Sequence, residues 1–123
     1  MLLDAFACAR DGDTDRLTQM LHVGVPVNLT NDRGDTLLIL SAYHRHPGAV
    51  ELLLARGADV DRVNDNGQTA LGAAAFRQDV AIVQALLGAG ADPDTGARSA
   101  RAVTQFFGLD AIAALLPPAG ATA

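Results

Sequence analysis

The chain has 123 residues, half of them hydrophobic, and carries a formal net charge of −5. This length fits one domain, and no apolar run reaches the roughly 18 residues of a membrane-spanning helix. The acidic balance argues against binding to nucleic acid or to an anionic membrane, because phosphate contacts need clustered lysine and arginine.

Residues of the same or a similar type recur every 33 positions along the chain. A period between about 20 and 50 residues indicates a solenoid, in which each unit buries its apolar face against its neighbours. Solenoids usually present a surface to a partner and rarely carry out chemistry. The recurring residues include three glycines, three leucines and three turn residues: Gly24, Gly57, Gly90, Leu21, Leu54, Leu87, Asn28, Asp61 and Asp94.

The first unit, residues 2–30, is expected to form an N-terminal cap. A short helix is predicted over 4–10 and a second over 14–22, with a turn rich in aspartate and glycine between them. Gly24 then suits a position with a positive φ just beyond the second helix.

The second unit covers residues 31–63 and begins with a turn. Thr36 is expected to cap a helix over 37–44, and a second helix is predicted over 47–56, where a proline suits the first turn. Gly57 ends that helix.

The third unit, residues 64–96, repeats this organisation. Thr69 is expected to cap a helix over 70–77, and a second helix is predicted over 80–88. An extended exit follows, as in the second unit.

The last unit, residues 97–116, is a shortened C-terminal cap. Its helices are predicted over 98–107 and 110–116, followed by a tail over 117–123. Two adjacent leucines match the leucine pair of the third unit at a spacing of 29, so we expect four residues to be missing from the turn before Ser99.

The two central units resemble ankyrin repeats. The resemblance implies an all-α solenoid of stacked helix-turn-helix units with short hairpin fingers, spanning about residues 2–116. The second unit carries the motif at Gly34, Thr36, Leu38, Ser41, Ala42, Val50, Leu53, Leu54 and Gly57 through Asp61. The third carries it at Gly67, Thr69, Leu71, Ala74, Ala75, Val83, Leu86, Leu87 and Gly90 through Asp92.

Some positions depart from the family pattern. Ile39 and Gly72 replace its histidine, and Arg45 and Gln78 replace the glycine between the two helices of a unit. Leu37 and Ala70 replace its proline. We expect the alanines to allow close approach of the first helices, the leucines to fill the space between the second helices, and the ring of Phe107 to belong to the core of the C-terminal cap.

The resemblance implies a protein partner bound on the concave face. Tyr43 and Phe76 occupy equivalent positions of successive units, so we expect their rings side by side; they form either an interface or a lid over the core. The proposed partner-binding residues are Arg33, Asp35, Tyr43, His44, Asn66, Gln68, Phe76 and Arg77, and equivalent helix positions elsewhere are Arg10, Asp11, Gln105 and Phe106.

No motif for catalysis, a cofactor or a metal ion is found. His44 and His46 are two positions apart, so their side chains diverge on a helix, whereas paired ligands need a spacing of three or four. Asp59 and Asp61 lack the other ligands of a calcium loop. Cys8 is the sole cysteine; it cannot form an internal disulfide, and we expect a buried, inert thiol.

The leading hypothesis is a non-enzymatic, monomeric protein-protein interaction module. The alternative is a dedicated regulatory or chaperone-like subunit for an enzyme encoded nearby, and a catalytic or ligand-sensing role ranks third. The N-terminus lacks the basic segment of a signal peptide, so we expect a cytoplasmic protein. All nine basic residues are arginine, which favours a GC-rich bacterial genome.

Overall fold

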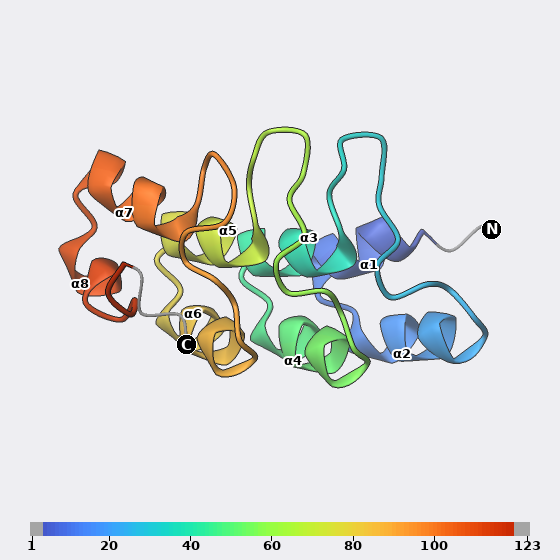
Figure 1. The fold of residues 1–123 in the computed structure, drawn as a ribbon. Coiled ribbons are helices and arrows are strands. Elements are labelled where there is room, and N and C mark those ends of the chain that lie inside the picture. Colours follow the sequence, from blue (N-terminus) through green and yellow to red (C-terminus); the bar gives the residue numbers. More distant parts are fainter. Residues whose placement is uncertain (1–3, 120–123) are drawn as a thin grey trace.

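A computed structural model describes residues 4–119 of the chain. Within them, eight helices stack as four antiparallel pairs in chain order (Figure 1). The pairs are α1 (Ala5–Asp11) with α2 (Thr14–His22), α3 (Leu37–Tyr43) with α4 (Pro47–Ala55), α5 (Ala70–Phe76) with α6 (Val80–Gly88), and α7 (Ala100–Phe107) with α8 (Asp110–Ala113).

The helices form two layers. The first helices α1, α3, α5 and α7 lie in one layer and the second helices α2, α4, α6 and α8 in the other, and the loops that join successive pairs extend as fingers from the first layer (Figure 1). We name these loops finger 1 (30–36), finger 2 (63–69) and finger 3 (95–99). An isolated antiparallel bridge between Thr30 and Thr36 closes finger 1.

Three buried hydroxyl groups fix where the first helices begin. The side-chain oxygens of Thr36, Thr69 and Ser99 accept hydrogen bonds from the backbone N–H three positions later, at 3.0, 3.1 and 3.2 Å. Each satisfies a donor that the first helical turn leaves free. The predicted caps Thr36 and Thr69 are therefore confirmed, and Ser99 plays the same part in the last pair.

The core runs continuously between the layers. Ala42, Ala74 and Ala75 are fully buried between the first helices, whose small side chains permit close approach. Leu53 and Leu86 are fully buried among the second helices. Burying side chains of this size is worth roughly 1.5–3 kcal/mol each, so these leucines contribute substantially to the stability of the stack.

The last pair differs from the expected boundaries. Helix α7 begins at Ala100, after its Ser99 cap, and not at residue 98; α8 ends at Ala113, not at 116. After Ala113 the backbone closes into tighter turns, with hydrogen bonds from N–H groups to carbonyls three positions earlier. Pro117 disfavours a helical conformation at the residue before it, which explains the early end of α8.

The spacing of the last unit is also corrected. The equivalent caps Thr36 and Thr69 differ in number by 33, but Thr69 and Ser99 differ by only 30, so the last unit lacks three residues and not four. Leu116 is the equivalent of Leu86 at this same spacing of 30, and both are buried. The expected match at a spacing of 29 was therefore one position out of register.

Four equivalent turns between paired helices adopt a left-handed backbone. Their φ angles are 71° at Gly12, 63° at Arg45, 56° at Gln78 and 64° at Gly108. Glycine adopts this conformation freely, whereas other L-residues pay roughly 1–2 kcal/mol for it. The two central repeats therefore hold local strain that the terminal pairs avoid.

Candidate binding groove

A buried asparagine builds finger 2. The side-chain oxygen of Asn64 accepts hydrogen bonds from the backbone N–H of Asn66 (3.0 Å) and of Gln68 (2.9 Å). Its Nδ2 donates to Asp35 Oδ1 at 2.7 Å and to Gln68 Oε1 at 3.0 Å, which ties finger 2 to finger 1. Asn31 supports finger 1 through the same backbone bonds. Asn64 stands 33 positions after Asn31, and this spacing is the sequence signal of their shared role.

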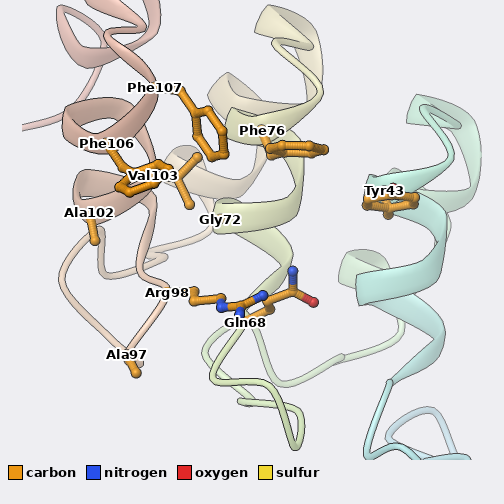
Figure 2. A pocket seen from close by; sticks show the side chains of 10 residues that line it. All are labelled: Tyr43, Gln68, Gly72, Phe76, Ala97, Arg98, Ala102, Val103, Phe106 and Phe107. Carbon is orange, nitrogen blue, oxygen red and sulfur yellow. The ribbon is translucent and has the colours of Figure 1, made fainter.

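The fingers and the first helices enclose a groove made of two adjoining hollows. The N-terminal hollow, about 530 Å³, lies between fingers 1 and 2 and helices α3 and α5. The C-terminal hollow, about 560 Å³, lies between finger 2, finger 3, α5 and α7 (Figure 2). Tyr43 and Gln68 line both hollows, so we treat the two as one groove.

Most of the predicted partner-binding residues meet in this groove. The N-terminal hollow is lined by Arg33, Asp35, Tyr43, His44, Asn66 and Gln68, together with Arg10. Phe76 and Phe106 line the C-terminal hollow. Arg77, Asp11 and Gln105 line neither hollow. The structure adds Arg98 and Phe107, which the sequence did not single out for binding.

Aromatic rings form a row along the C-terminal hollow. Tyr43 and Phe76 are stacked, with ring centroids 6.3 Å apart and planes at 7°, so their predicted side-by-side placement is confirmed. Phe107 meets Phe76 edge-on at 5.4 Å, and Phe106 meets Phe107 at 4.8 Å (Figure 2). Phe107 is 53% exposed. The expectation that it belongs to the core of the cap is therefore wrong: the ring continues the row instead.

Two basic side chains, those of Arg77 and His44, flank Tyr43. The guanidinium of Arg77 lies 5.2 Å from the centroid of the Tyr43 ring, within the range of a cation–π interaction. His44 meets the same ring edge-on at 5.2 Å. Partial burial lowers the pKa of His44, and the positive charges of His46, Arg10 and Arg77 lower it further.

The remaining candidate residues, His46 and Cys8, lie where their side chains serve the fold. His46 Nε2 donates to the backbone carbonyl of Arg10 at 2.6 Å, and its ring packs against Gly12. Within residues 4–119 no group of three or more histidine, cysteine or acidic side chains is placed to hold a metal ion. Cys8 is buried, and this burial raises the pKa of its thiol, with a smaller contribution from Asp13.

The aspartates between repeats also serve the fold. Asp61 Oδ1 accepts a hydrogen bond from the backbone N–H of Asp92 at 2.8 Å. One repeat earlier, Asn28 Oδ1 accepts from the backbone N–H of Asp59 at the same distance. The same bond therefore recurs in successive repeats, and it joins the segments that follow the second helices.

A family model for ankyrin repeats, in three copies, matches residues 5–97. The chain belongs to the ankyrin repeat family. Ankyrin repeats are generally protein-protein interaction modules. The match ends before α7, so the last helix pair, which forms one wall of the C-terminal hollow, lies outside it.

A relative of the chain is also named as an ankyrin repeat protein. A protein of Pseudomonas aeruginosa that is named as an ankyrin repeat protein is 49% identical over 47 residues, which is 38% of this chain and 28% of that protein. This chain therefore matches less than a third of that relative's length. No helix within residues 4–119 is long and apolar enough to cross a membrane.

Proposed function

We propose that this ankyrin repeat chain is a non-enzymatic, monomeric interaction module of the cytoplasm that binds a partner protein in the groove. The observation that carries the proposal is the aromatic row beside Arg77. Four of the five aromatic residues of the chain line the C-terminal hollow. Phe106 is 84% exposed and Phe76 43% exposed, and large apolar side chains gathered on a surface mark interaction sites.

The chemistry of the row supports a protein partner. Tyrosine and arginine are enriched among the residues that dominate protein-protein binding energy. The first helices hold the rings on a packed layer, and the bonds of Asn31 and Asn64 hold fingers 1 and 2. Little conformational freedom is therefore lost when a partner binds. The net charge of −5 disfavours nucleic acid and anionic membranes as partners.

The test is a double substitution, Tyr43→Ala with Phe76→Ala. In pull-downs from the source organism followed by mass spectrometry, we expect the partner of the wild-type chain to be lost, since truncating a dominant interface residue typically costs about 2 kcal/mol or more. Thermal unfolding followed by circular dichroism reports on the fold. Tyr43 packs partly against the core, so a modest fall in melting temperature is expected.

The matched control is Val23→Ala, which truncates an apolar side chain that is 79% exposed beyond α2 and outside the groove. It should retain the partner. Retained capture by the double variant would contradict the proposal, and so would a collapsed melting curve, because the rings would then serve the core. One stoichiometric enzyme in the wild-type pull-down would favour the alternative of a dedicated regulatory subunit, whereas several partners would favour a general module.

A further inference from the structure

A residue without a side chain, Gly72, lies at the floor of the C-terminal hollow. Gly72 occupies the position equivalent to Ile39, which is buried in the wall of the N-terminal hollow. A Cβ at Gly72 would lie 2.8 Å from the Arg98 carbonyl oxygen, so the shortened finger 3 approaches α5 closely at this point. The rest of the floor is small or aliphatic, with Ala97 and Ala102 among the lining residues (Figure 2).

The arginines of the chain fall into two groups. Five of the nine lie within 4.0 Å of an aspartate oxygen. The other four make no such pair with any carboxylate of residues 4–119. Three of those four lie at the groove: Arg33 and Arg98 line it, and Arg77 lies over Tyr43. The fourth, Arg56, follows the end of α4 in the opposite layer.

The position of Arg98 is fixed by its backbone. Its N–H donates to the Gly67 carbonyl at 2.9 Å, and it forms an isolated parallel bridge with Gln68. The side chains of Arg98 and Gln68 lie together at one end of the hollow, and the phenylalanine rings lie at the other (Figure 2). No acidic residue of the described chain lines the C-terminal hollow, whereas Asp32 and Asp35 line the N-terminal one.

We infer that the C-terminal hollow binds a short acidic segment of a partner protein that carries an apolar anchor. The anchor packs against the phenylalanine rings, and carboxylates toward the opposite end of the hollow pair with Arg98. Arginine suits this role because its planar guanidinium binds a carboxylate through two parallel hydrogen bonds. This inference rests on the proposed function, because it assumes that the groove binds protein.

Panning a random linear peptide library against the full chain tests the inference. We expect enriched peptides in which aspartate or glutamate neighbours an aromatic or large aliphatic residue. Enriched peptides that bind the groove but are neutral or basic would overturn the acidic partner while leaving the proposed function standing. If no enriched peptide is sensitive to Tyr43→Ala with Phe76→Ala, the hollow does not bind a linear segment and the inference fails, whereas the pull-down with the same double variant decides the proposed function.

Fluorescence anisotropy with the most enriched peptide then measures the charge contribution. Arg98→Gln should weaken binding about tenfold or more, as expected when a charge-assisted hydrogen bond is lost, and should flatten the dependence of Kd on salt. Arg56→Gln removes an equally unpaired guanidinium outside the groove and should leave Kd unchanged. Equal effects of the two substitutions would show that only net charge matters, which overturns the inference.

Two other occupants give distinct results. If truncation after residue 119 strengthens peptide binding, the chain's own last residues occupy the hollow, and the inference of a partner segment is wrong. A wild-type dimer in sedimentation that Arg98→Gln converts to a monomer would identify a second copy as the occupant, which also overturns it. A monomeric wild-type chain whose affinity is unchanged by the truncation supports the partner segment.

Discussion

The two central helix pairs and the last pair solve the same packing problem differently. In α3–α4 and α5–α6, a finger of full length lets each pair stack over its neighbour, and Leu53 and Leu86 are fully buried. In α7–α8 the finger is shorter and the second helix spans only Asp110–Ala113. Phe106 and Phe107 are left exposed there.

This comparison separates the buried core from the candidate binding surface along one solenoid. The central pairs are covered on both sides and contribute most of the buried core. The last pair is covered on one side by α5, and its uncovered rings face the groove. The unit that follows the repeat least closely therefore supplies most of the exposed rings of the candidate surface.

Leucine truncations should show the largest contrast between the two regions. Leu53→Ala and Leu86→Ala should each lower the free energy of unfolding by roughly 2–5 kcal/mol, because each removes a fully buried side chain between pairs. Leu116→Ala, in the short last unit, should cost about 2 kcal/mol or less. Urea unfolding measures all three, and equal midpoints for Leu86→Ala and Leu116→Ala would remove the distinction.

A pair of glycine substitutions tests the close approach of finger 3. Gly72→Ala should destabilise by about 1 kcal/mol, since overpacking against the Arg98 carbonyl costs roughly 1–3 kcal/mol and alanine returns up to about 1 kcal/mol of helix propensity. Gly88 is also helical, and a Cβ added there would meet no atom within 4 Å. Gly88→Ala should therefore stabilise by about 0.5–1 kcal/mol. If Gly72→Ala and Gly88→Ala both stabilise the chain, finger 3 can move away from α5 at little cost in free energy.

Glycine substitutions in the strained turns of the central repeats should stabilise the chain. Gln78→Gly should stabilise by about 0.5 kcal/mol, because relief of the left-handed conformation exceeds the entropy that glycine loses on folding. Arg45→Gly should gain less, since Arg45 also pairs with Asp79 at 3.4 Å. Gly12→Ala should destabilise, because its Cβ would lie 2.5 Å from His46 Nδ1. Thermal unfolding ranks the three, and a loss at Gln78→Gly would show that no strain is held there.

The smallest effect concerns pH at the edge of the groove. The folded chain lowers the pKa of His44 below its ordinary value near 6.5, so the unfolded chain binds the proton more readily. The penalty is absent above about pH 6.5 and grows as the pH falls through that value toward the lowered pKa. As the pH falls through this range, the free energy of unfolding of wild type minus that of His44→Asn should therefore decrease. A flat or rising difference would contradict it.

The sequence by itself determined the repeat and the positions of most helices. The reason is that these signals are local: Thr36 and Thr69 cap helices through bonds to nearby N–H groups, and the period of 33 places Tyr43 beside Phe76 without any knowledge of distant contacts. Most predicted partner-binding residues meet in one groove for the same reason, although their role in binding stays a prediction.

Only the tertiary structure decided how the last helix pair packs and what shape the groove takes. Phe107 is exposed, and the Arg98 carbonyl of finger 3 closely approaches Gly72 of α5; both are outcomes of packing between units. The exposed side chain of Arg98 lines the same hollow as the rings, at its opposite end. These features arise between segments that belong to different units of the solenoid, where chain-local patterns of caps and periodicity carry no information about distance.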